Sequence, residues 1–143
     1  MKVTDDQIAS MRAYLRGDVE TFDRISAQLD AASKEARGAL ITAAFFNAAE
    51  RTFKDGGRAE VIEFVGRVRA RSADLAQSID PRIAERLILA TFTDEDVEDV
   101  DGKTQGDHFG ILLAGIIAEA QLSDAELNSF LDESRKLADK WLA

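Results

Sequence analysis

The stretch KEARGALITAAFFNAAERTFK, residues 34–54, decides the fold class. A helix that is apolar over most of its circumference is normally central and buried. We therefore expect a core helix from about Ser33 or Lys34 to Lys54 in an all-α protein. Phe46 adds apolar area on a further side of this helix, beyond a wide apolar arc formed by Leu40, Ile41, Ala44, Phe45, Ala48, Ala49 and Phe53.

The rest of the chain also shows helical spacing and no sustained alternation of the kind found in half-buried strands. Thr4 and Ser123 open sequences typical of capping boxes, and Asp80-Pro81 is a clean helix start. We expect Arg58 to Ser78 to form one helix and Trp141 to pin the last helix to the bundle. We also expect a second central helix, capped by Asp107, that carries the apolar residues Phe109, Ile111, Leu112, Leu113, Ile116 and Ile117.

These patterns predict one all-α domain over residues 1–143. It is a bundle of six or seven helices with two central apolar helices and an acidic connecting segment at about 93–107. The two segments around Gly17-Asp18 are expected to form a tight helical hairpin with Val19 facing inward. A chain of 143 residues with 45% hydrophobic and 31% charged residues has a globular composition.

The absence of cysteine excludes disulfides, thiolate catalysis and metal sites built on cysteine. The first ten residues, MKVTDDQIAS, lack the apolar core of a signal peptide. The longest apolar run, residues 111–118, is far shorter than the roughly 20 residues that span a bilayer. We therefore expect a cytoplasmic protein that does not bind a membrane.

The net charge of −9 is spread unevenly along the chain. Residues 1–71 hold 12 basic and 11 acidic side chains, and residues 72–143 hold 6 basic and 16 acidic ones, a net charge of −10. Such a surface repels nucleic-acid phosphates and attracts basic proteins. The charge pattern therefore predicts a basic protein partner and no nucleic acid.

Residues 91–108, TFTDEDVEDVDGKTQGDH, concentrate the acidic side chains against a single Lys103. Carboxylates packed this densely repel one another and favour a solvated loop, a cation or a basic partner. No register of the segment places ligands and glycine as an EF-hand requires, so we assign no metal site, and weak divalent binding stays open. The predicted partner-binding residues are Asp94, Glu95, Asp96, Glu98, Asp99 and Asp101.

No catalytic signature accompanies His108, the only histidine, which we interpret as a helix-start residue with a local hydrogen bond. Gly102-Lys103-Thr104 resembles the end of a phosphate loop but lacks its earlier glycine and its strand. Arg67 and Arg71 share one helical face and Arg69 points roughly opposite; we interpret this basic concentration as solvated rather than as a site for phosphate or an acidic partner. The sequence therefore predicts a non-enzymatic protein without catalytic residues, metal or cofactor.

The sequence favours two classes of function. The first is an acidic helical interaction protein, of the inhibitor, immunity or antitoxin kind, that masks a basic partner. The alternative is a small-molecule-binding or regulatory domain with an apolar pocket between its central helices, lined by Phe45, Phe46, Phe109, Leu113 and Ile117. A third hypothesis is an enzyme that holds magnesium in the acidic segment. Homodimerisation is compatible with all three.

Overall fold

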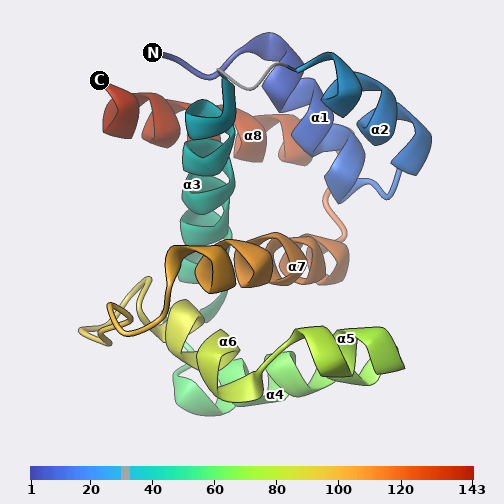
Figure 1. Ribbon diagram of the computed structural model, residues 1–143. Helices are drawn as coiled ribbons and strands as arrows, with labels where there is room; N and C mark the ends of the chain where they lie inside the picture. Colours follow the sequence, from blue (N-terminus) through green and yellow to red (C-terminus); the bar gives the residue numbers. More distant parts are fainter. Residues whose placement is uncertain (30–32) are drawn as a thin grey trace. The chain divides into compact units, whose positions relative to one another are not determined.

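The computed structural model describes residues 1–29 and 33–143 (Figure 1). Within these residues the regular structure is entirely helical, which confirms the all-α class, but there are eight helices rather than six or seven. They are α1 (Asp5–Leu15), α2 (Val19–Gln28), α3 (Lys34–Phe53), α4 (Arg58–Ala70), α5 (Ala73–Ser78), α6 (Pro81–Leu89), α7 (Gly102–Ala120) and α8 (Asp124–Leu142). None of the helices in the described part of the chain is long and apolar enough to cross a membrane.

The chain divides into two compact units. The first unit comprises Met1–Ala44 and Ile117–Ala143, and the second unit comprises Phe45–Ile116. The boundaries fall inside α3 and α7, which therefore contribute residues to both units. Buried residues occur along all of α3, from Ala36 to Phe53, as its apolar arc predicts.

In the first unit, α1 and α2 form the expected helical hairpin. Thr4 accepts a hydrogen bond from the backbone N–H of Gln7, whose side chain bonds back to the backbone of Thr4, so the predicted capping box is present. Gly17 has a φ of +72°, a left-handed conformation that glycine adopts without strain. The prediction for Val19 is wrong, because this residue, at the exposed start of α2, is 66% exposed.

Side chains of α8 hold the N-terminal residues of the same unit. Asp139 accepts a hydrogen bond from the backbone N–H of Val3 at 2.8 Å, and Arg135 donates to the carbonyl of Val3 at 2.8 Å. At the other end of α8, Arg12 of α1 and Arg16, which follows that helix, form ion pairs with Asp124 at 3.4 and 3.0 Å. These contacts join α1 and α8 at both ends.

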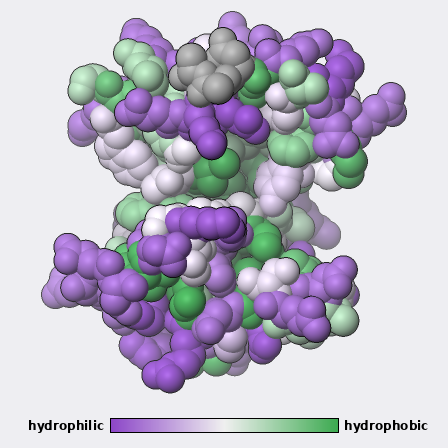
Figure 2. Space-filling view, in the orientation of Figure 1, coloured by the Kyte–Doolittle hydropathy of each residue, from purple (hydrophilic) through white to green (hydrophobic). Residues whose placement is uncertain are grey.

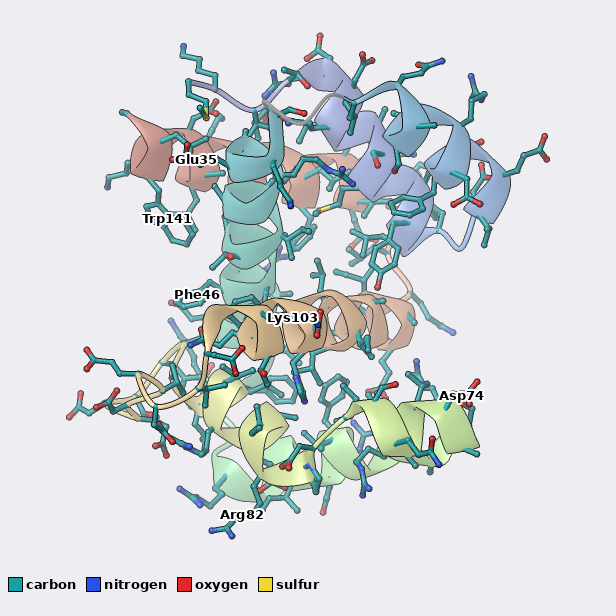
Figure 3. All side chains as sticks on the ribbon, in the orientation of Figure 1. Glu35, Phe46, Asp74, Arg82, Lys103 and Trp141 are labelled. Atoms are coloured by element: carbon teal, nitrogen blue, oxygen red, sulfur yellow. The ribbon has the colours of Figure 1, made fainter. Side chains whose placement is uncertain are left out.

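Trp141, which we expect to pin the last helix to the bundle, is only partly buried. This side chain is 45% exposed, and Figure 3 shows it near the C-terminal end of α8. The buried residues of α8 lie earlier, where Leu127, Phe130 and Leu131 are each at most 2% exposed. They follow the helical spacing that the sequence shows, whereas Trp141 lies one residue before the end of the helix, where fewer neighbours can cover it.

In the second unit, α4 packs closely against α7. A Cβ atom added to Gly115 would lie 3.0 Å from a methyl of Val68 and 3.3 Å from the ring of Phe64. Glycine at this position therefore permits a close approach between the two helices. The ring of Phe64 also contacts Phe53, with centroids 5.2 Å apart.

The predicted helix from Arg58 to Ser78 is two helices, which accounts for one additional element. Ser72 has extended backbone angles, and its hydroxyl accepts a hydrogen bond from the N–H of Leu75, so it caps α5. Arg69 of α4 donates to the carbonyls of Ala76 and Ile79, each at 3.0 Å. The side chain of Arg69 thus satisfies carbonyls at the end of α5, and the chain turns at Arg71 and Ser72 instead of continuing.

The start of α7 also differs from the prediction. The helix begins at Gly102, not after Asp107, because Asp101 accepts hydrogen bonds from both the backbone N–H and the hydroxyl of Thr104. The segment between α6 and α7 is correspondingly shorter than the predicted 93–107 connection. We call residues 94–101 the acidic loop.

Candidate functional site

The acidic loop joins α6 to α7 within the second unit. It is the olive-coloured excursion at the left of Figure 1, and Figure 2 shows hydrophilic surface over the same region. Of its six carboxylates, only that of Glu95 belongs to a half-buried residue. The other five residues are exposed: Asp94, Asp96, Glu98, Asp99 and Asp101. At the C-terminal end of the loop, Val100 is buried and anchors the chain to the unit.

One arginine of α6, Arg86, binds several residues of this loop. The two terminal nitrogens of Arg86 donate to the two carboxylate oxygens of Asp99, at 3.0 and 2.6 Å. Its Nε lies 3.5 Å from a carboxylate oxygen of Glu95, and Nη2 also donates to the carbonyl of Asp96. A two-pronged pairing of guanidinium and carboxylate fixes both distance and orientation. Arg86 therefore fastens the middle of the loop to α6 at three places.

The pairing changes the acid–base properties of both partners. The hydrogen bonds from Arg86 hold the pKa of Asp99 below its ordinary value, and the same bonds raise the pKa of Arg86. The Asp99 carboxylate therefore stays ionised at and below neutral pH. It remains largely exposed, so its attraction to Arg86 is screened by water and salt.

Local hydrogen bonds shape the remainder of the loop. Thr93 accepts from the N–H of Glu95 and donates to the carbonyl of Leu89, while a carboxylate oxygen of Asp96 accepts from the N–H of Glu98 at 2.8 Å. Side chains of aspartate and threonine commonly form such turns. These bonds bend the loop through two consecutive turns.

At the C-terminal end of the loop, α7 contributes further contacts. The side-chain amide of Gln105 donates to the carbonyls of Val97 and Val100, at 3.2 and 2.8 Å. The hydrogen bonds from Thr104 lower the pKa of Asp101. Aspartate is a preferred cap because its carboxylate satisfies N–H groups of the first helical turn. The carboxylate of Asp101 therefore caps the helix that follows it.

The six predicted partner-binding residues thus fall into two groups. Asp99, Glu95 and Asp101 have partners within the chain, the first two with Arg86 and the third in the cap of α7. Asp94, Asp96 and Glu98 are exposed, and the side chain of Asp96 forms a local turn bond. The structure brings Glu95 and Asp99 together around one cation, uses Asp101 as a helix cap and leaves the second group at the surface.

Arg86 is the residue that sequence reasoning missed. The sequence contains a signal for it, because Arg86 lies in the last turn of a helix that leads directly into the acidic run. Exposed ion pairs carry little predictive weight individually, and several carboxylates compete for the same cation. The pairing depends on a loop conformation that the spacing of residues does not reveal.

Lys103, the basic residue that the sequence places beside the acids, serves α7 instead. Figure 3 shows it at the start of that helix, and its ammonium lies 3.0 Å from a carboxylate oxygen of Asp107, one turn later. The hydrogen bond to Asp107 raises the pKa of Lys103. Asp107 is accordingly a partner of Lys103 inside the helix and not the helix cap that the sequence predicts.

His108 has two hydrogen-bond partners and is 5% exposed. Its Nε2 accepts from the backbone N–H of Asp80 at 3.1 Å, and Nδ1 lies 2.8 Å from the carbonyl oxygen of Thr104. Since a carbonyl can only accept, Nδ1 carries the hydrogen and donates to it. His108 lies in the second turn of α7 rather than at its start, and it ties α7 to the first residue before α6. The expected local hydrogen bond is present.

The aromatic residues of the alternative hypothesis pack on one another. The rings of Phe45 and Phe109 stack with centroids 4.7 Å apart, and Phe46 meets Phe109 edge to face at 6.5 Å. Phe45 and Leu113 are fully buried, Phe46 is half-buried, and Ile117, which belongs to the first unit, is 5% exposed. Contact at these distances is typical of core packing. A ligand pocket at these residues stays a prediction.

Across the residues that the structure describes, no three or more histidine, aspartate or glutamate side chains are grouped so that they could hold a metal ion. The carboxylates of the acidic loop therefore do not form a ready set of magnesium ligands. Arg86 occupies the position that a cation would take beside Asp99. The magnesium hypothesis has no cluster of ligands to support it within those residues.

None of the comparisons with protein-family models, with curated proteins or with solved structures found a match to this chain. The functional argument therefore depends on the geometry and charge of the site.

Proposed function

We propose that the protein is a non-enzymatic interaction protein that presents the acidic loop to a basic protein partner. The supporting observation is that the loop is both strongly acidic and held in a defined conformation. Arg86, Thr93 and Gln105 fix its backbone, and Asp94, Asp96 and Glu98 remain exposed on it. A fixed array of charges loses less conformational entropy on binding than a flexible one.

The distribution of charge over the two units also supports the proposal. The second unit holds 9 basic and 14 acidic side chains, and six of those acids lie in the acidic loop. Without the loop, the charges of this unit nearly balance. The negative charge of the unit is therefore concentrated in one exposed segment, which is the arrangement that steers a basic partner towards a particular surface.

The proposed partner is a basic protein, and an inhibitor, immunity or antitoxin role, in which this chain masks a basic effector, is the specific form we propose. Arginine and lysine side chains of the partner would meet the exposed carboxylates of Asp94, Asp96 and Glu98. Exposed charge pairs contribute mainly to the rate of association and to specificity. Binding by this loop is therefore expected to weaken as salt is added.

The test is affinity capture from the native host with three forms of the full chain. The loop variant is Asp94→Asn with Glu98→Gln, which removes two exposed charges and leaves Arg86, Asp99 and Asp101 in place. The control variant is Glu63→Gln with Asp74→Asn, which removes the same charge from α4 and α5. Figure 3 shows Asp74 on the far side of the second unit from the loop.

We expect the wild type and the control variant to retain a basic protein, identified by mass spectrometry, that the loop variant retains much less. Circular dichroism should show the same helical content for all three forms, because both loop positions are exposed. Capture of the same proteins by all three forms, or of no basic protein by the wild type, would contradict the proposal.

A further inference from the structure

We propose that Arg86 is a salt-sensitive latch that holds the acidic loop in the conformation in which it binds its partner. The role of the latch in partner binding rests on the proposed function, whereas the contacts that form the latch belong to the chain alone. The guanidinium joins three points of the loop, the side chains of Glu95 and Asp99 and the carbonyl of Asp96, to one residue of α6. A second link to α6 runs through Thr93, which accepts from the N–H of Glu95 and donates to the carbonyl of Leu89.

The shape of the guanidinium is essential to the latch. Both terminal nitrogens contact Asp99 while Nε faces Glu95, so all three nitrogens of the group are used. A lysine ammonium is a compact point charge and cannot make this planar two-pronged contact. Arg86→Lys would therefore keep the charge of the protein and lose most of the latch.

For a variant that lacks Arg86, the latch predicts a change in partner affinity opposite to the change expected from net charge alone. Replacement of Arg86 by glutamine removes one positive charge and makes the loop region more negative. If charge alone attracted the basic partner, this variant would bind more tightly. If Arg86 acts by positioning the loop, the variant binds more weakly, because the loop must then be ordered during binding.

The exposure of the pairs makes the latch sensitive to salt. The side chains of Arg86 and Asp99 are 31% and 68% exposed, and that of Glu95 is 27% exposed. Attraction between exposed charges is reduced as salt shortens the Debye length from about 10 Å at 0.1 M to about 3 Å at 1 M. Raised salt is therefore expected to release the loop before the helices unfold.

The test uses glutamyl endopeptidase on the full chain, because Glu95 and Glu98 lie within the loop and supply cleavage sites. Cleavage at these two sites is followed by mass spectrometry from low to high sodium chloride. A synthetic peptide of residues 91–102 corrects for the effect of salt on the protease. Arg82→Gln is the matched control, since it removes the same charge from the same helix at the end remote from the loop (Figure 3).

We expect cleavage of the wild type to rise with salt after correction with the peptide. Arg86→Gln should be cleaved about three to ten times faster at low salt, the range expected for the loss of one or two exposed ion pairs, and should respond little to salt. Arg82→Gln should behave as the wild type. Equal cleavage of Arg86→Gln and the wild type, or the same salt response in both, would overturn the proposal.

Asp99→Asn opens the same latch from the other side and serves if Arg86→Gln fails to fold, as judged by circular dichroism. The double variant should be cleaved no faster than Arg86→Gln alone, since the contact that Asp99→Asn removes is already lost in Arg86→Gln. Arg86→Lys should resemble Arg86→Gln more than the wild type. Full protection in Arg86→Lys would show that charge alone holds the loop and would overturn the positioning role.

These outcomes are independent of any partner. Failure of the cleavage test would remove the latch and leave the proposed interaction to be judged by affinity capture. Failure of the capture test would leave a latch whose loop has another use. With the partner in hand, weaker binding by Arg86→Gln at unchanged helical content supports positioning, and tighter binding contradicts it.

Discussion

At the scale of single residues, the site is determined by which carboxylates already have a hydrogen-bond or ion-pair partner within the chain. Asp101 is occupied by the first turn of α7 and Asp99 by Arg86. Both interactions lower the pKa of the carboxylate involved. Sequence reasoning identified the acidic residues but not this division, because it depends on where the loop folds relative to one arginine.

The lowered pKa values predict how stability depends on pH. A carboxylate with a depressed pKa in the folded protein contributes stability above its unfolded pKa, about 3.9, and loses that contribution as the pH falls through the folded value. The stability difference between the wild type and Asp101→Ala should therefore be largest above about pH 4 and shrink at lower pH. Urea unfolding followed by circular dichroism from pH 2 to 6 measures it. A difference that grows as the pH falls would contradict the role of Asp101.

His108 gives a second prediction at this scale. His108→Ala removes the acceptor for the N–H of Asp80 and the donor to Thr104, and it leaves space beside the buried ring. The free energy of unfolding should fall by about 1–3 kcal/mol, the cost of leaving a buried polar group without its partner. Urea unfolding at neutral pH would show it. No change in stability would mean that the link between Asp80 and α7 is dispensable.

At the scale of elements, local rules predicted most helix starts. Thr4, Asp18, Asp80 and Ser123 all cap helices as the sequence indicates, because a cap depends on a few adjacent residues. The break at Ser72 was not predicted, since Leu75 and Ile79 continue the apolar spacing of α4. It is favoured by the bonds from Arg69 to carbonyls seven and ten residues away, which spacing alone does not show.

The glycines of α7 allow a matched test of helix packing. Nothing lies within 4 Å of a Cβ added to Gly106, so Gly106→Ala should raise the free energy of unfolding by up to about 1 kcal/mol through helix propensity. Gly115→Ala should gain less or be destabilising, because its methyl would press on Val68 and Phe64. Thermal and urea unfolding of the two variants compare them directly. Equal stabilisation would show that Val68 and Phe64 of α4 move aside for the added methyl group at little cost in free energy.

At the scale of the whole molecule, the two halves of the sequence and the two units of the structure distribute charge differently. By sequence, residues 1–71 are nearly neutral and residues 72–143 carry a net −10. By structure, the first unit holds 9 basic and 13 acidic side chains, and the second unit 9 and 14. The two units therefore carry similar net charges, and the acidic loop is the local concentration that distinguishes the second.

The central claim is that this loop binds a basic partner. The most direct measurement is the dissociation constant of the captured partner, by isothermal titration calorimetry, for the wild type, the loop variant Asp94→Asn with Glu98→Gln, and the control variant Glu63→Gln with Asp74→Asn. We predict binding weaker by about tenfold for the loop variant, equivalent to roughly 1.4 kcal/mol, and nearly unchanged for the control. Equal affinity of all three forms would contradict the claim and place the interface elsewhere.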